Sequence, residues 1–357
     1  MKKYMLLLSL SAVFTLILLA GCANRPAATV TPAAPPAAPA PAASQPPAAA
    51  EVTAEEPEAE PAAIRIAAMR GPTALGLLKL MYEEEQGNTF NNYSFELLGS
   101  PDEVPPLLVR GEIDVAAVPG NLAAVLYNRM EGEVQALAVV TLGVLHVVDL
   151  TGEIQSVSDL RGRTIFVSGQ GATPEFALNY VLSQNGLTPG VDVFVEFRAE
   201  HTEIAALLET GQAEIALLPE PFVSTVLARI EGLELALDLT EEWNRVQPDY
   251  GLIMSVVIAR REFLENNAKA VAVFMEEYAA SIEFMTTNIT GGAELAVNFG
   301  LIPAQPIAES ALPRTHIVFL TGEEMRQNLM GFYNVLYEAE PGSIGGELPE
   351  DDFFFLP

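Results

Sequence analysis

The stretch LVRGEIDVA, residues 108–116, recurs in altered form later in the chain as LETGQAEIA, residues 208–216. Each copy has the pattern of a short helix end, a glycine, a polar residue, an acidic residue and then an apolar strand. A helix that leads through a glycine turn into a buried strand is a building unit of α/β proteins. The two copies predict that the folded part of the chain contains two similar α/β halves.

Apolar segments on both sides of these copies continue the alternation of strand and helix. Strands are expected at residues 64–68, 94–98, 113–118, 134–141, 164–167, 193–197, 214–218 and 233–238. Helices are expected at 74–85, 104–109, 202–210, 261–287, 292–299 and 322–337, with others ending near 129, 184 and 230. The alternation predicts an α/β protein with βαβ units on parallel sheets, built as two lobes around a cleft. We expect residues 64–142 and 249–357 to form lobe 1 and residues 143–248 to form lobe 2.

The N-terminus has the pattern of an export signal. Lys2 and Lys3 precede an apolar segment, residues 5–20, which is shorter than the ~20 apolar residues that span a bilayer comfortably. Leu19-Ala20-Gly21-Cys22 contains the single cysteine of the chain and resembles the bacterial lipobox. That resemblance implies a signal peptide at 1–21, cleavage before Cys22 and a lipid anchor on the Cys22 thiol. An ordinary signal peptide with a chance cysteine is the alternative.

Residues 22–63 are rich in alanine and proline and predict a disordered tether that holds the folded part away from a membrane surface. The formal net charge is −29, and it becomes −31 without Lys2 and Lys3 (16 basic minus 47 acidic side chains). A surface of this charge repels nucleic acid and anionic lipid, so a nucleic-acid partner is not expected.

The order of these motifs resembles a known family. Arg70-Gly71-Pro72-Thr73, residues 108–116, Asp159-Leu160-Arg161-Gly162-Arg163 and residues 208–216 are similar to the substrate-binding lipoproteins of ABC importers. The nitrate/sulfonate/taurine type and the thiamine-pyrimidine-precursor binding proteins are the branches that the chain resembles most, over nearly all of 64–357. The resemblance implies the type II periplasmic binding protein fold and one small ligand. It also implies a monomer, lipid-anchored on the extracytoplasmic face, that delivers its ligand to an ABC permease in the cytoplasmic membrane.

In open α/β sheets a ligand lies beyond the carboxyl ends of the strands. Four strand-to-helix junctions, residues 69–73, 118–121, 168–173 and 218–222, should therefore line the cleft, with free backbone N–H groups and the positive ends of helix dipoles. The candidate ligand-binding residues are Arg70, Gly71, Thr73, Ser100, Asn121, Thr141, Ser168, Gly169, Gln170, Thr173, Glu220 and Phe222. The alternative for Thr73, Ser100, Asn121 and Thr173 is that they only cap helices.

Two of these residues point to different ligands. Arg70 suits a sulfonate, nitrate or carboxylate, whereas Glu220, together with Phe222, Trp243 or Tyr250, suits an amino-bearing heterocycle such as a pyrimidine. A solvated surface position for Arg70, a helix-dipole role for Glu220 and core packing for the aromatic residues are the alternatives. We expect the lobes to close by a hinge near Val139–Gly143 and Tyr250–Ser255.

Enzymes of the same fold, in menaquinone-precursor or thiamine-pyrimidine synthesis, form the first rival class. Against them, His146, His201 and His316 match no metal motif, Ser168 lacks the glycine pattern of a nucleophile elbow, and no Walker loop is present. We therefore expect no catalytic residue, no metal and no cofactor. A second rival is a ligand-binding subunit of a membrane sensor, which the sequence does not separate from an importer subunit.

Overall fold

The computed structural model describes residues 60–356 of the chain. The predicted signal peptide, Cys22 and most of the predicted tether lie outside the described residues. Within them, no helix is long and apolar enough to cross a membrane. The first strand begins at Ala63, so the folded part starts where the composition changes.

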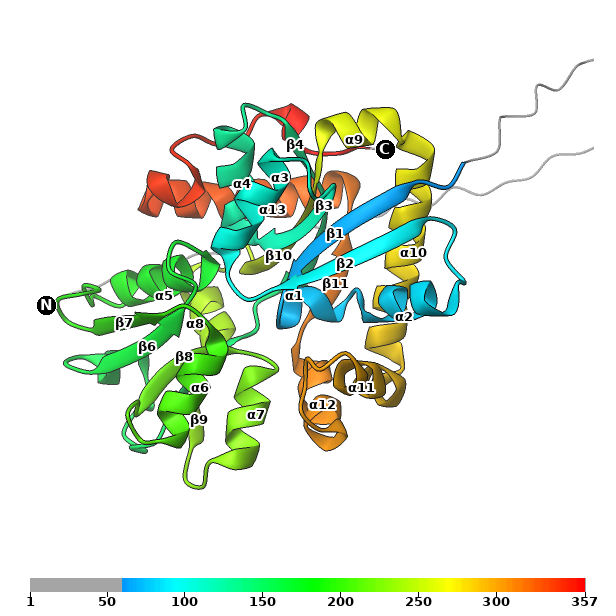
Figure 1. The fold of residues 1–357 in the computed structure, drawn as a ribbon. Coiled ribbons are helices and arrows are strands. Elements are labelled where there is room, and N and C mark those ends of the chain that lie inside the picture. The colour runs from blue at the N-terminus through cyan, green and yellow to red at the C-terminus, as the bar shows by residue number, and fades with distance from the viewer. Residues whose placement is uncertain (1–59, 357) are drawn as a thin grey trace, which may run out of the picture. The chain divides into compact units, whose positions relative to one another are not determined.

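Eleven strands form two sheets in the described part of the chain (Figure 1). The six-stranded sheet has the order β11-β4-β10-β3-β1-β2, and the five-stranded sheet has the order β7-β6-β8-β5-β9. The strands are β1 (Ala63–Met69), β2 (Asn92–Leu98), β3 (Val115–Pro119), β4 (Val134–Leu142), β5 (Leu145–Asp149), β6 (Thr164–Ser168), β7 (Phe194–Arg198), β8 (Ile215–Pro219), β9 (Glu234–Asp238), β10 (Ile253–Arg260) and β11 (Ile317–Leu320).

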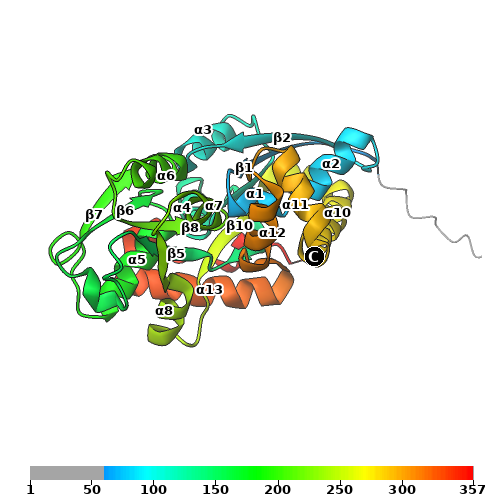
Figure 2. The same cartoon turned by 90° about the horizontal axis from the view of Figure 1, so that it is seen from below.

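Helices flank both sheets (Figure 2). They are α1 (Pro72–Leu75), α2 (Leu78–Gln86), α3 (Val104–Val109), α4 (Gly120–Arg129), α5 (Thr173–Gln184), α6 (His201–Glu209), α7 (Phe222–Arg229), α8 (Leu239–Val246), α9 (Arg261–Asn266), α10 (Ala268–Thr287), α11 (Ile289–Asn298), α12 (Gln305–Ala311) and α13 (Gly322–Ala339). We call the six-stranded sheet with its helices the first lobe and the five-stranded sheet with its helices the second lobe.

The chain passes between the lobes twice, at residues 143–144 between β4 and β5 and at 247–252 between α8 and β10. Both entering strands run antiparallel to their neighbours: β5 against β8 and β9, and β10 against β3 and β4. The expectation of wholly parallel sheets is therefore wrong for these strands. Each of these strands enters its sheet straight from the other lobe and not through a helix of its own lobe, so it is not part of a βαβ unit and antiparallel pairing is open to it.

Other differences from the sequence-based expectation have local causes. The expected helix 74–85 is broken into α1 and α2 around Gly76, the C-cap of α1. The strands β5, β10 and β11 and the helices α8 and α12 were not expected. β5 is only LHVVD, and an apolar run of this length has no period that separates strand from buried helix.

A single apolar core cluster contains buried residues of both sheets, including Val118 and Leu217. Trp243 on α8 is completely buried, and its ring lies 4.8 Å from Tyr180 and 5.9 Å from Phe332 of the first lobe. Near the C-terminus Phe353 is also fully buried, and its ring lies 5.0 Å from that of Tyr127. Apolar packing therefore joins the lobes.

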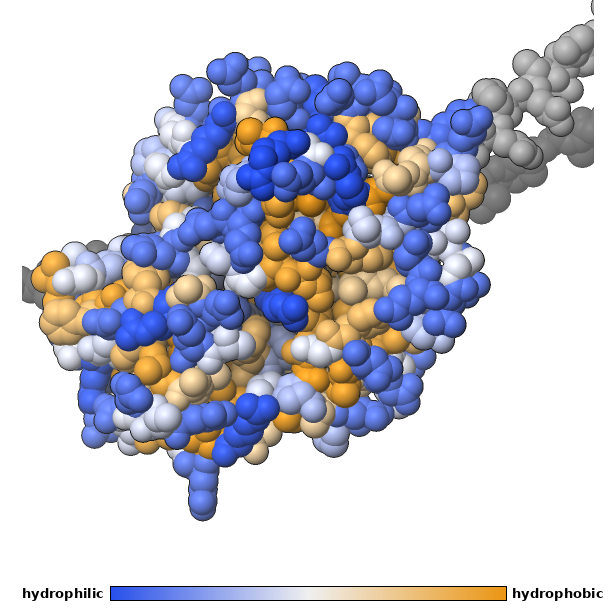
Figure 3. Space-filling view, viewed as in Figure 1, coloured by the Kyte–Doolittle hydropathy of each residue, from blue (hydrophilic) through white to orange (hydrophobic). Residues whose placement is uncertain are grey.

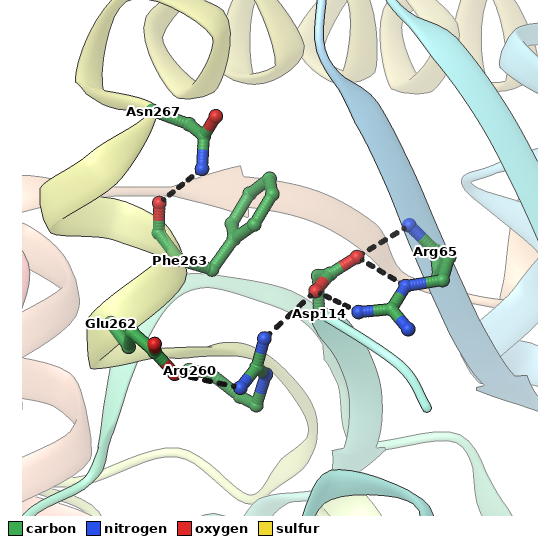
Figure 4. Close-up of polar contacts among 6 residues, drawn as sticks. All are labelled: Arg65, Asp114, Arg260, Glu262, Phe263 and Asn267. Carbon is green, nitrogen blue, oxygen red and sulfur yellow. Dashed lines mark hydrogen bonds and ion pairs between the residues drawn. The ribbon is translucent and has the colours of Figure 1, made fainter. Parts of the chain in front are cut away.

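A charge network around the buried Asp114 closes the end of the first sheet at which β1 and β3 begin (Figure 4). Asp114, just before β3, accepts hydrogen bonds from Nε and Nη2 of Arg65 at 2.8 and 2.6 Å and from Nη2 of Arg260 at 3.1 Å. Burial alone would raise the pKa of Asp114, but the hydrogen bonds from the two arginines outweigh it, and the pKa is lowered. The network ties three strands together at the end of the sheet away from Met69 and Pro119.

Candidate functional site

A small cavity of about 60 Å³ lies between the lobes, at the carboxyl ends of β1, β3, β6 and β8. It is lined by Met69, Arg70, Pro72, Thr73, Gly99, Pro101, Pro119, Ser168, Gly169, Ala172, Pro174, Ala199, His201, Pro219, Met254 and Ser255. Most of these residues are apolar, and Figure 3 shows apolar residues gathered in the middle of the face that carries both sheets, with polar residues around them. The cavity thus lies where the strand-end rule predicts a ligand site.

Glycines bring the backbone close to this cavity. Gly71 joins β1 to α1 with a φ of 118°, and a Cβ at this position would lie 3.3 Å from Cε2 of Phe222 in the second lobe. Only glycine combines this φ with so close an approach of the opposite lobe. Gly169, after β6, also has a positive φ, of 76°, which turns the chain toward α5.

Arg70 is the one charged side chain that lines the cavity. It is exposed, and within residues 60–356 its guanidinium has no carboxylate partner. Most arginines of the described chain are paired, as Arg65 and Arg260 are with Asp114. The backbone N–H of Arg70 donates to the carbonyl of Leu98 at 2.9 Å, which holds the junction in place. An unpaired guanidinium at the mouth of an otherwise apolar cavity favours an anion.

Two pairs of polar side chains complete the lining. Thr73 Oγ1 and Ser255 Oγ lie 2.9 Å apart and are buried. Ser168 Oγ is hydrogen-bonded to Nδ1 of His201, whose ring lies 4.8 Å from that of Phe222. Burial lowers the pKa of His201 to about 4, so the imidazole is neutral at pH 7. In each pair one hydrogen forms the bond between the two side chains. The other hydroxyl or imidazole hydrogen is left to donate to a further acceptor.

The sequence-predicted residues separate into two groups. Arg70, Thr73, Ser168 and Gly169 line the cavity, and Gly71 adjoins it. Ser100 lies between two lining residues, but its side chain caps the 3-10 helix Pro101–Glu103. It is the one of the four proposed caps whose side chain accepts a helix N–H in that position.

Asn121 and Thr173 do not line the cavity. Both are completely buried and bind each other across the lobes: Thr173 Oγ1 donates to Asn121 Oδ1 at 3.1 Å and accepts from the Asn121 backbone N–H at 3.2 Å. Asn121 Nδ2 also donates to the carbonyls of Gly171 and Ser343. Their polar groups are used in joining α4 to α5.

Glu220 does not line the cavity either. It is fully buried, and its carboxylate binds Arg314 and the backbone N–H of Ser224. The acceptor that the sequence suggested for an amino-bearing ligand is therefore occupied. Phe222 packs on His201 rather than on the cavity.

The remaining predicted residues lie elsewhere. Gln170 is exposed, and Thr141 is buried without a hydrogen-bond partner within the described residues. Trp243 is a core residue whose indole N–H donates to the carbonyl of Tyr250 at 2.8 Å. The side chain of Tyr250 is 44% exposed.

Sequence reasoning missed His201 and Ser255 as lining residues. His201 begins α6 directly after β7, a strand-to-helix junction of the same kind as the four that were chosen. Ser255 lies inside the antiparallel strand β10 and had no such signal. Among residues 60–356 no group of three acidic, His or Cys side chains could hold a metal ion.

The family model described as menaquinone biosynthesis matches residues 64–338. An ABC transporter structure from Parabacteroides distasonis is 22% identical, covers 83% of this chain and 98% of its own, and has a TM-score of 0.66. The alkanesulfonate-binding protein of Xanthomonas axonopodis pv. citri, bound to MOPS, is 15% identical over 79% and 94% of the two chains, with a TM-score of 0.64. The periplasmic nitrate-binding protein of Synechocystis PCC 6803 is 13% identical over 67% of each chain, with a TM-score of 0.54. The search of curated proteins finds no match.

At these identities the likeness shows the fold. The two mixed sheets with flanking helices match periplasmic binding proteins of type II, and the fold expected from the sequence is confirmed. The structural neighbours include binding proteins of ABC importers, and the menaquinone family has the same fold.

Proposed function

We propose that this chain, which belongs to the family described as menaquinone biosynthesis, is an extracytoplasmic solute-binding protein that captures a small anion between its lobes. Sulfonate, nitrate and carboxylate are the ligand classes that the site favours. No bond of the ligand is made or broken. The solute is passed to an ABC permease in the cytoplasmic membrane.

The unpaired guanidinium of Arg70 carries this proposal. In a chain of net charge −29, no carboxylate lines the cavity, and the one charged lining side chain is a cation. The Thr73–Ser255 and Ser168–His201 pairs add neutral donors, and apolar residues exclude water. An anion gains from every one of these groups, whereas a cation or an amino-bearing heterocycle finds no charged acceptor. An anion bound by Arg70 is therefore preferred over an amino-bearing heterocycle bound by Glu220.

The remaining features of the proposal rest on the sequence. The signal at 1–21 and acylation of Cys22 would anchor a monomer on the outer face of the membrane through the tether at 22–63. Residues 64–142 with 249–357 and residues 143–248 would be the two lobes. The hinge would lie at Val139–Gly143 and Tyr250–Ser255, which adjoin the two passages between the sheets.

The family's description also favours an enzyme as a second candidate. A general base works best when its pKa lies near the working pH, and the pKa of His201, about 4, makes this imidazole a weak base at pH 7. That argument supports binding over proton abstraction by the one histidine that lines the cavity.

Binding to the purified full chain would test the proposal. Nitrate, methanesulfonate and acetate would be titrated by calorimetry, with neutral cytosine as the comparison ligand, and each mixture would be analysed afterwards by mass spectrometry. We expect at least one anion to bind in a one-to-one ratio and to be recovered unchanged. Binding of cytosine alone, binding of none of the anions, or chemical conversion of the ligand would contradict the proposal.

A further inference from the structure

An ion pair connects the lobes beside the cavity. Arg314 ends the 3-10 helix Leu312–Arg314, which leads into β11 of the first lobe, while Glu220 follows β8 of the second lobe. Nε of Arg314 donates to Oε1 of Glu220 at 2.8 Å, and Nη2 donates to Oγ of Ser224 at 2.5 Å. We propose that Arg314 is a positioning residue for ligand binding, which holds the lobes closed through Glu220 without touching the ligand. This inference rests on the proposed binding function.

Both ends of the contact are well defined. Glu220 is completely buried, and its Oε2 accepts the backbone N–H of Ser224 at 3.1 Å. Two nitrogen atoms of the Arg314 guanidinium donate to the second lobe, one to Glu220 just before α7 and one to Ser224 on α7. This planar group therefore fits the two acceptors together. If the lobes separated here, a buried carboxylate would lose its counter-charge, which is unfavourable.

The position of the pair explains how it can act on the cavity. Pro219, the neighbour of Glu220, lines the cavity, and Phe222 packs on His201 and faces Gly71. Helix α7 lies beside α12 of the first lobe in both views (Figures 1 and 2). Arg314 and Glu220 are themselves absent from the lining. The pair therefore fixes the segment that forms one wall of the cavity.

A second polar contact between the lobes differs in kind. Asn121 binds Thr173 and Gly171 on the side of α4 and α5, and all of its partners are neutral. Loss of the neutral contact leaves neutral groups without a partner, whereas loss of the ion pair leaves a carboxylate without its counter-charge, which costs more wherever Glu220 stays out of water. We infer that the charged pair contributes more to the preference for closure.

The test compares Arg314→Gln and Arg314→Lys with a matched control, Arg229→Gln. Arg229 lies on α7, the helix that Arg314 contacts through Ser224, but it pairs with Glu209 inside the second lobe at 3.3 Å. The distance between the lobes would be measured by pulsed electron resonance in the full chain with Cys22→Ala, spin-labelled at Val191→Cys and Glu265→Cys. Both positions are exposed, one in each lobe. Affinity for methanesulfonate, nitrate and acetate would be measured in parallel.

For Arg314→Gln we expect a longer and broader distance distribution without ligand and at least tenfold weaker binding of the anion that the unmodified chain binds. Arg314→Lys should lie between, because it retains the charge and loses the fork. Arg229→Gln should match the unmodified chain in both measurements. Unchanged distances in a folded Arg314→Gln protein would overturn the inference.

Two further outcomes are informative. If Arg314→Gln does not fold, Glu220→Gln with Arg314→Gln removes both charges; a double variant that is folded and as closed as the unmodified chain would also overturn the inference. If the unmodified chain binds none of the three anions, the proposed function fails. The distances measured without ligand would still show whether Arg314 holds the lobes closed. Failure of the proposed function can therefore be distinguished from failure of the inference about Arg314.

Discussion

Thr73 Oγ1 and Ser255 Oγ lie 2.9 Å apart in a buried position, although 182 residues separate them in the sequence. Thr73 belongs to the junction after β1, and Ser255 to the strand that re-enters the first lobe from the second. The pair thus joins the first wall of the cavity to the start of the returning strand. Both residues line the cavity, so their bond serves the fold and the site together.

We expect Thr73→Val and Ser255→Ala each to lower the free energy of unfolding by about 1–2 kcal/mol. Each change removes one of the two buried hydroxyls and leaves the other without this hydrogen bond. The double variant should cost little more than either single change, since both partners are then removed. Urea unfolding of the four proteins gives the coupling energy. Simple additivity of the two losses would show that the hydroxyls do not interact.

Replacing Arg70 should weaken anion binding with little effect on stability. A hydrogen bond to a charged group contributes about 1.5–3 kcal/mol, so Arg70→Gln should bind roughly 10–150 times more weakly by calorimetry. Arg129→Gln is the matched control, because Arg129 is also an arginine without a carboxylate partner in residues 60–356 but does not line the cavity. Equal affinities for the two variants would remove Arg70 from the site.

Asp114→Asn should lower the free energy of unfolding by about 2–3 kcal/mol, because it leaves Arg65 and Arg260 without their shared buried counter-charge. Anion affinity should stay unchanged, since the network lies at the opposite end of β1 and β3 from the cavity. Glu112→Gln, at an exposed ion pair with Arg110, should cost less than about 1 kcal/mol. Denaturant unfolding would compare both variants with the unmodified chain, and calorimetry would measure the anion affinity of Asp114→Asn; a larger loss of stability in Glu112→Gln than in Asp114→Asn would contradict the assignment.

Stability should fall as the pH falls from about 6.5 to about 4. The pKa of His201 is lowered from 6.5 to about 4 by burial, so between these values the unfolded chain binds the proton and the folded chain does not. The contribution of His201 is complete above pH 6.5 and is lost at up to about 1.4 kcal/mol per pH unit toward pH 4. His146, whose pKa burial also lowers, acts in the same direction.

His201→Gln should therefore flatten the dependence of unfolding free energy on pH between 7 and 5, although its stability at pH 7 can differ. Chemical unfolding at several pH values measures the slope. If the slopes of His201→Gln and the unmodified chain coincide, His201 is not held neutral by the fold.

Cys22→Ala should abolish attachment of lipid. In a bacterial host grown with labelled palmitate, the unmodified chain should carry the label and sediment with membranes. The variant should carry none. Label that persists in Cys22→Ala would place the acylation elsewhere and contradict the lipobox interpretation.

Much of the local structure follows from the sequence. Short apolar runs followed by Gly, such as residues 64–68 and 164–167, predicted strands and the junctions to the helices after them. The place of the cavity followed as well, since carboxyl ends of parallel strands meet at one edge. Arg70, Thr73, Ser168 and Gly169 were named on this ground and line the cavity.

The partners of the side chains were decided by tertiary structure. Asn121, Thr173 and Glu220 stand at strand-to-helix junctions like Arg70, but their partners come from the other lobe, 52 residues away for Thr173 and Asn121 and 94 for Glu220 and Arg314. His201 and Ser255 also line the cavity, and their side-chain partners Ser168 and Thr73 lie 33 and 182 residues away in the sequence. Backbone conformation depends largely on near neighbours, so the sequence predicted most of the elements and their junctions. Burial, pairing and pKa depend on which distant segments the folded chain brings together, and only the packed lobes decide whether a polar group meets solvent, a ligand or a counter-charge.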